Sequence, residues 1–190
     1  MRHSAFALLL TLMAAAAGCR HAAPDSAPAR WDAAEGVYYL DGMHLRYAPE
    51  NGTRWMVADA AALPDGFAMC MVDTAAGISV SIIEPQGIAR GKRPADCSQA
   101  DIERIVADIT GRQALPATVE SRSVERAEYL GAPAWRFATT MALRPDSSTT
   151  VCVHYAGYAF DTGDATGIIA VTAPAQASIA AQPYLEYLTR

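Results

Sequence analysis

Apolar and polar residues alternate in short runs over most of the chain after residue 36, and a period of two predicts strands. Residues 37–40 and 43–47 flank an Asp-Gly pair, which favours a tight hairpin turn. Residues 67–73 and 78–84 are joined by a linker short enough for a second hairpin. We therefore expect an antiparallel sheet to begin in the first half of the chain.

One segment has the spacing of an amphipathic helix. Ser98 is suited to cap its first turn, and Asp101 three residues later completes a pattern close to a capping box. Gly111 suits the residue at which the helix ends. The apolar stripe at helical spacing consists of Ile102, Ile105, Val106 and Ile109. We expect this helix to pack on the sheet.

Four more strand-like runs follow, at about 118–129, 134–142, 149–160 and 167–173. The turns between them are short, which implies antiparallel neighbours. The last segment, 178–188, is amphipathic and predicts a second helix. This order of elements predicts an α+β fold, with a twisted antiparallel sheet and helices packed on it, in a single domain over 37–190.

The start of the chain is typical of an export signal. A basic start precedes an apolar run at 5–17, which is shorter than the roughly 18 residues that a membrane-spanning helix needs. Residues 16–19, Ala-Ala-Gly-Cys, resemble a bacterial lipobox, although Ala16 stands where Leu is usual. The resemblance implies that residues 1–18 are a lipoprotein signal peptide and that Cys19 receives acyl chains such as palmitate. The alternative is ordinary cleavage at a nearby alanine, which would release an unanchored protein.

Residues 19–36 are expected to hold the lipidated cysteine and a flexible tether, because Ala, Pro and mixed charges follow each other there without periodicity. Residue 20 is Arg, and not the Asp that resembles an inner-membrane retention signal. In a bacterium with two membranes, this implies a location on the periplasmic face of the outer membrane. The lipid would supply the contact with that membrane.

The charge balance is acidic, with a formal net charge of −5 and scattered basic residues. Removal of the signal peptide takes Arg2 with it and leaves 14 basic residues against 20 acidic ones. This balance argues against nucleic acid as a partner and against docking on anionic lipid.

Four cysteines are present, and lipidation of Cys19 leaves Cys70, Cys97 and Cys152. An oxidising compartment favours one disulfide and one odd cysteine. Hairpin pairing of the 67–73 strand would bring its start to the edge where the helix begins. On that basis we expect Cys70 and Cys97 to form a disulfide, with Cys152 as a buried strand residue.

The residues 39–49, which contain Asp-Gly and Ala-Pro steps, resemble the opening strand and Pro turn of PsbP-like and DcrB-like domains. Residues 131–137 are similar to a later step of those domains, in which a small residue and Pro precede a strand. The likeness covers about 37–190. The resemblance implies a fold in which an antiparallel sheet lies between helices. It also implies a binding or assembly protein, because these families share no catalytic motif that could be transferred to this sequence.

The sequence contains only weak matches to catalytic or metal-binding motifs. Asp-Thr-Gly at 161–163 resembles the catalytic loop of aspartic proteases, but that chemistry needs a second carboxylate, and a hairpin turn explains the motif better. Cys152 and His154 share one strand face, where a packed pair is a better interpretation than a catalytic dyad. His44 and His154 lack the spacing of metal ligands. We therefore expect no catalytic residue, no metal and no cofactor.

Aromatic residues remain as candidates for a binding surface, namely Tyr38, Tyr39, Trp55 and Tyr158. Aromatic side chains are enriched at binding hot spots, but they are also ordinary core residues. Tyr38 and Tyr39 are consecutive in a strand and point to opposite faces, so at least one is accessible if only one face is covered.

Together these observations favour a non-enzymatic binding or assembly domain that contacts another envelope protein from the outer membrane. The alternative is an immunity-type inhibitor of a periplasmic toxin that degrades the cell wall. A third hypothesis is an enzyme, which requires polar groups to converge near His154, Asp161 and Asp164.

Overall fold

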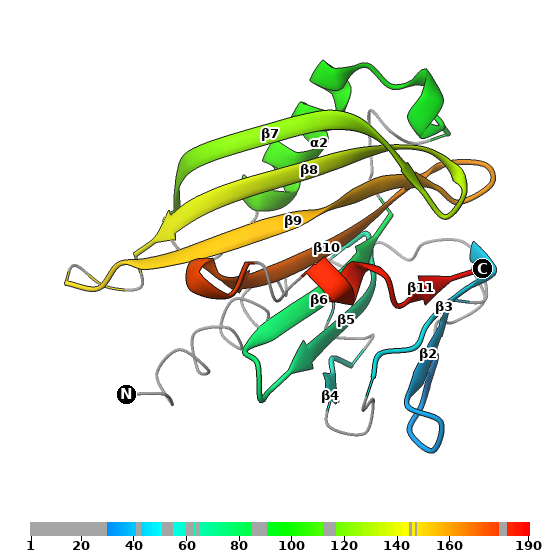
Figure 1. Ribbon diagram of the computed structural model, residues 1–190, viewed down its shortest axis with the longest axis horizontal. Coiled ribbons are helices and arrows are strands. Elements are labelled where there is room, and N and C mark those ends of the chain that lie inside the picture. Colours follow the sequence, from blue (N-terminus) through cyan, green and yellow to red (C-terminus); the bar gives the residue numbers. More distant parts are fainter. Residues whose placement is uncertain are drawn as a thin grey trace.

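The computed structural model describes residues 30–40, 43–50, 55–59, 63, 65–84, 91–111, 117–144, 146, 148–178 and 182–190. Figure 1 shows strands through most of these ranges and one α-helix behind the longest of them. In chain order the elements are β1 (Arg30–Asp32), β2 (Val37–Leu40), β3 (Leu45–Tyr47), β4 (Trp55–Val57), β5 (Phe67–Asp73), β6 (Ile78–Ile83), η5 (Pro94–Asp96), α2 (Gln99–Gly111), β7 (Ala117–Tyr129), β8 (Ala132–Leu143), β9 (Val151–Asp161), β10 (Thr166–Pro174), η6 (Ala175–Ala177), η7 (Gln182–Leu185) and β11 (Leu188–Thr189).

The strands form two antiparallel sheets. The smaller one, sheet A, has the order β1-β2-β3-β11, and the larger one, sheet B, has the order β4-β5-β6-β10-β9-β8-β7. The predicted hairpins β2–β3 and β5–β6 and the four later strands are confirmed. Strand β1 pairs with β2, so the sheet already begins at Arg30, within the segment expected to be a tether.

One core lies between sheet A and part of sheet B. Sheet A contributes buried residues such as Tyr47 and Leu188, which face Met71, Val80 and Ile169 of sheet B. Tyr47 is fully buried, and its ring meets those of Trp55 and Tyr187 edge to face. Burial of apolar area on both sheets is the main force that holds them together.

A second core lies on the other face of sheet B, under α2. The four apolar residues of the predicted helical stripe are all buried there against β8, β9 and β10. The predicted capping box is confirmed: the Ser98 backbone N–H and hydroxyl donate to Oδ2 of Asp101, and the Asp101 N–H donates back to the Ser98 hydroxyl at 3.2 Å. The cap satisfies backbone donors that the first helical turn leaves unpaired.

The predicted α+β class is wrong, because the described chain is mainly β, with α2 as its single α-helix. Residues 182–185 form the 3₁₀ turn η7, where a second helix was expected, and Leu188 pairs with Tyr47. Pro183 lacks the N–H that a helix interior requires, and turn and strand bury Leu185 and Leu188 without a helix. Among the described residues, no helix has the length and apolar character to cross a membrane.

Candidate functional site: the open half of the larger sheet

Half of one face of sheet B lacks the cover that sheet A gives to the rest. Residues paired across strands project to the same side of a sheet. Thr140 pairs with both Ser121 and His154, and Ala138 pairs with both Ser123 and Ala156. The six side chains that form these two rows are exposed or half-buried: Ser121, Ser123, Ala138, Thr140, His154 and Ala156. We call this surface of β7, β8 and β9 the open face (Figure 1).

The opposite face of the same strands is covered. Phe137, Thr139 and Tyr155 alternate with the open-face residues along β8 and β9, and they are buried on the α2 side. The residues next to them on the open face have small side chains. The open face is therefore flat. Because large residues face α2 and small ones face away, the alternation in β8 and β9 places the helix on one side and leaves the other available to a partner.

Strand β7 forms the outer edge of this region. It is 13 residues long and, within the described residues, pairs with β8 alone. All its residues are exposed except Val124, Ala127 and Tyr129, which are half-buried. Its register shifts between Val119 and Ser121, a bulge of the kind that protects edge strands from indiscriminate pairing.

Charged side chains mark one end of β7. The Arg126 guanidinium lies 3.9 Å from the centre of the Trp135 ring, and the indole N–H donates to the carbonyl of Pro94 at 2.9 Å. On the open-face side, Arg136 lies 3.8 Å from a carboxylate oxygen of Glu125. Both signs of charge are therefore displayed along this edge, which favours a polar partner of mixed charge.

Two stacked tyrosines form the boundary between the open face and the first core. The rings of Tyr129 and Tyr158 are parallel, with centroids 4.4 Å apart, and Phe160 meets Tyr129 edge to face. The Tyr129 hydroxyl donates to the carbonyl of Leu185, and burial raises the pKa of this tyrosine above its usual value. Tyr158 is therefore a half-buried boundary of the surface, packed against a tyrosine that is itself bonded to the C-terminal turn.

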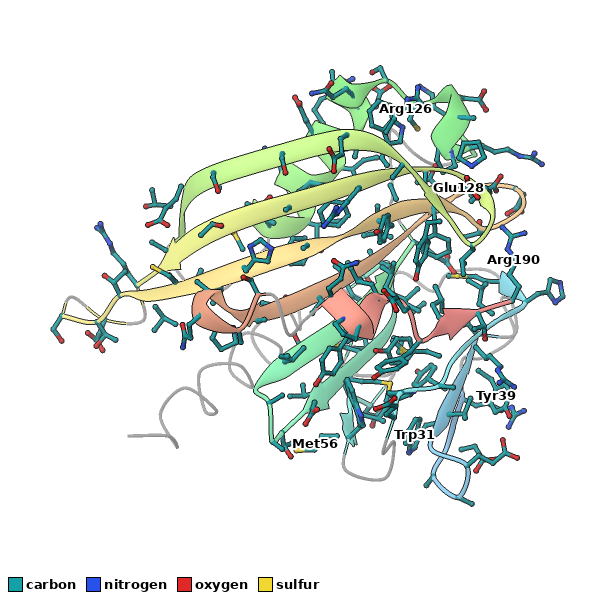
Figure 2. The ribbon with its side chains drawn as sticks, viewed as in Figure 1. Trp31, Tyr39, Met56, Arg126, Glu128 and Arg190 are labelled. Carbon is teal, nitrogen blue, oxygen red and sulfur yellow. The ribbon has the colours of Figure 1, made fainter. Side chains whose placement is uncertain are left out.

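The four aromatic candidates are not brought together. Tyr38 and Trp55 are 2% and 7% exposed and belong to the first core, whereas Tyr39 lies half-buried on the outer side of sheet A. Figure 2 shows Tyr39 beside the hairpin of β1 and β2, well away from Arg126 and Glu128 on β7. Of the four, only Tyr158 borders the open face.

The predicted disulfide does not form, and Cys70 and Cys97 are present as thiols. Cys70 lies 3.1 Å from the Ser81 hydroxyl, and Ser81 is paired with Ala170. Cys97 lies instead by Thr166, with its sulfur 4.0 Å from that hydroxyl. Thr166 and Ala170 are four residues apart on β10, or about 13 Å along a strand, which is beyond disulfide reach.

Cys152 is exposed, so its expected burial is wrong, because the β9 side of Cys152 and His154 is the uncovered one. Partial burial lowers the pKa of His154. Asp161 lies seven residues further along β9, and its carboxylate accepts the Gly163 N–H at 2.8 Å within a turn. Asp164 lies in the same turn, so the polar residues of the enzyme hypothesis are spread along β9 and the turn that follows it. Among the described residues, no three potential ligand side chains gather as they would around a metal ion.

Sequence reasoning missed the open face, although a signal for it exists. Residues 117–123 contain no large apolar residue apart from Val119, which is unusual for a strand in a well-packed sheet. Small residues also alternate with large ones in β8 and β9. Both patterns indicate strands that are covered on one side only.

Similarity to known proteins is found among solved structures. No protein-family model and no curated protein matches this sequence. Among solved structures, the chain is similar to cyanobacterial PsbP (CyanoP) from Synechocystis sp. PCC 6803, with a TM-score of 0.46 and 11% identity over 89% of this chain and 92% of that chain. That protein is of the PsbP type that the sequence resembles. A likeness at this level concerns the course of the chain, and nothing about function follows from it.

Proposed function

We propose that this protein is a lipid-anchored lipoprotein of the outer membrane, and that its domain binds an extended segment of another envelope protein along β7. The observation that carries the proposal is the exposure of this 13-residue strand on both sides and along its outer edge. The anchor rests on the sequence at residues 1–19, which lie outside the described residues.

Internal packing does not account for the length of β7. Its partly buried residues, Val124, Ala127 and Tyr129, all lie in its second half, so residues 117–123 bury little apolar area. Without that burial, ordering this half of the strand costs conformational entropy that backbone hydrogen bonds to β8 offset only in part. A long strand that buries so little apolar area within its own domain is well suited to binding a partner, which would bury the rest of its surface.

The geometry fits recognition by strand addition. An extended segment pairs with an open sheet edge through backbone hydrogen bonds, and side-chain pockets or charges supply specificity. Beside β7, the small side chains of the open face let a partner approach the sheet closely. Glu125 and Arg136 offer charges of both signs for the partner's polar residues.

A matched pair of variants tests this proposal in the full-length, membrane-held chain. Ser123→Arg places a long side chain on the open face, and Ala100→Arg places the same side chain on the exposed surface of α2. Envelope proteins that co-purify after chemical cross-linking are quantified for wild type and both variants. We expect Ser123→Arg to lose the partner by tenfold or more, as for a disrupted interface centre, while Ala100→Arg retains it; the factor corresponds to about 1.4 kcal/mol.

Equal recovery with both variants would contradict binding at β7. The identity of a captured protein also separates the two functional hypotheses. A structural or transport protein of the envelope supports an assembly role, whereas a cell-wall-degrading enzyme supports an immunity-type inhibitor.

A further inference from the structure

The side of β7 that faces α2 carries four residues at alternate positions, namely Arg122, Val124, Arg126 and Glu128. The first three pair with Thr139, Phe137 and Trp135 of β8, which are buried on the α2 side of the sheet. Paired residues project to the same side of a sheet, so these four side chains lie together along one border of β7. We call these four residues the α2 rim.

Two residues of the α2 rim are engaged within the domain. Val124 is half-buried and packs against the second core. The Arg126 guanidinium lies over the ring of Trp135 and donates to the carbonyls of Pro94 and Cys97, at 3.5 and 3.4 Å (Figure 2). The polar contacts of Arg126 are therefore made inside the domain, and its charge is directed towards η5.

The other two residues of the α2 rim, Arg122 and Glu128, are exposed. In the part of the chain that the structure describes, neither side chain forms an ion pair or a hydrogen bond. Their charges are opposite in sign and six positions apart, which is about 20 Å along a strand. A partner can therefore meet a free positive charge at one point of β7 and a free negative charge at another.

The opposite side of β7 belongs to the open face and differs in character. Ser121 and Ser123 lie there next to small side chains of β8. Partner side chains opposite these two serines therefore have room to be large. Glu125 follows on the same side, but Arg136 lies 3.8 Å from its carboxylate and offsets its charge. The partner residue opposite Glu125 should therefore be uncharged.

The direction of the sheet orders the two charges of a partner. All strand pairs that the structure describes in sheet B are antiparallel, so a strand added to β7 is expected to run antiparallel as well. In that direction the partner residue opposite Glu128 comes first, and the residue opposite Arg122 comes six positions later. A shift of the register by two residues, or a parallel strand, would lose both charge pairs. Charge thus selects one direction and one register.

We propose that β7 selects an extended segment with a basic residue and, six positions later, an acidic residue, which pair with Glu128 and Arg122. The inference rests on the proposed function and names the chemistry of its partner. The residues of the segment opposite Ser121 and Ser123 are large and uncharged, and they lie over the open face. Complementary charge contributes more to specificity than to affinity, so this pattern lets β7 reject other exposed segments of the envelope.

Two nine-residue peptides of equal composition test this pattern on the full-length chain in detergent. The first has Lys at its second position and Glu at its eighth, which places them opposite Glu128 and Arg122 when the peptide spans 121–129. The second has Lys and Glu exchanged, and both have Tyr at the seventh and ninth positions. Binding is measured by fluorescence anisotropy of the labelled peptides. We expect the first peptide to bind roughly tenfold more tightly, and the difference to shrink at high salt.

Two variants with the net charge of the wild type sharpen the test. Arg122→Glu with Glu128→Lys reverses the two free charges of the α2 rim, and we expect it to invert the preference, so that the second peptide binds more tightly. Arg30→Glu with Glu35→Lys makes the same exchange at exposed positions on and beside β1, and it should keep the wild-type preference. An unchanged melting temperature shows that each variant is folded.

Ser123→Arg separates failure of the charge pattern from failure of the proposed function. If both peptides bind the wild type equally and Ser123→Arg abolishes the binding of both, strands add to β7 but the charge pattern is contradicted. If neither peptide binds, or if Ser123→Arg leaves their binding unchanged, the inference is contradicted. The proposed function then fails as well only if recovery of the cross-linked envelope protein is also insensitive to Ser123→Arg.

Discussion

The hydroxyl of Tyr47 on β3 donates a hydrogen bond of 2.9 Å to the backbone carbonyl of Tyr184, a residue 137 positions later in the chain. The bond fastens the C-terminal turn to sheet A, and it lies within the fully buried aromatic cluster of the first core. Tyr155 in the second core is also buried, but among the residues that the structure describes its hydroxyl has no hydrogen-bond partner. The two tyrosines therefore provide a matched comparison.

Removal of the Tyr47 hydroxyl should destabilise the protein. We expect Tyr47→Phe to lower the free energy of unfolding by about 1–2 kcal/mol, because the carbonyl of Tyr184 loses its donor. Tyr155→Phe should leave stability unchanged or raise it by up to about 1 kcal/mol, because it removes a buried hydroxyl that makes no bond. Urea denaturation of both variants measures the free energy of unfolding. If Tyr155→Phe lowered it as much as Tyr47→Phe, the stabilising role of the Tyr47 hydrogen bond would be refuted.

The helix cap should make stability depend on pH. Hydrogen bonds from the backbone and side chain of Ser98 lower the pKa of Asp101 in the folded state. A lowered folded pKa stabilises the protein above the ordinary aspartate pKa of about 3.9, and this contribution is lost as the pH falls through the folded value. Asp101→Asn should therefore destabilise the protein at pH 7, and the difference from wild type should shrink towards pH 3. A pH-independent difference would argue against the cap as its source.

Gly157 on β9 should tolerate no side chain. A Cβ at this position would lie 1.9 Å from the backbone oxygen of Ile169 on the neighbouring strand, and backbone cannot yield as a flexible side chain can. We expect Gly157→Ala to cost about 3 kcal/mol or more, as severe overpacking does. Gly111 at the end of α2 has open space around it, so Gly111→Ala should change the melting temperature little. Similar melting temperatures for the two variants would contradict the close approach of β9 and β10.

Sequence patterns predicted local structure well, but they did not predict which faces of the strands other elements would cover. The hairpins and α2 follow from turn residues, the Ser98 cap and apolar spacing, all of which act within a few residues. The pairing of Leu188 with Tyr47 joins the two ends of the domain, and no local pattern encodes it. For the same reason the sequence could place Tyr38 and Tyr39 on opposite faces, but not show which face the core would cover.

The cysteines should differ sharply in reactivity. Cys152 is exposed, whereas Cys70 and Cys97 are buried, and burial raises the pKa of the Cys70 thiol to about 11. We therefore expect one fast-reacting thiol in the native protein at pH 8, because the thiolate is the reactive form. Unfolding should expose three thiols if Cys19 is lipidated, and a fourth would show that it is not. A single thiol after unfolding would instead reveal a disulfide between Cys70 and Cys97.

Binding at β7 is tested most directly by site-specific photo-cross-linking in the producing cells. A photoreactive amino acid replaces Ser121 on the open-face side of β7 in one variant and Asp108 on the exposed surface of α2 in another, each in the full-length chain. We predict a discrete adduct with one envelope protein from position 121 and none from position 108. The absence of an adduct from position 121, or equal adducts from both positions, would contradict the claim that β7 is the binding edge.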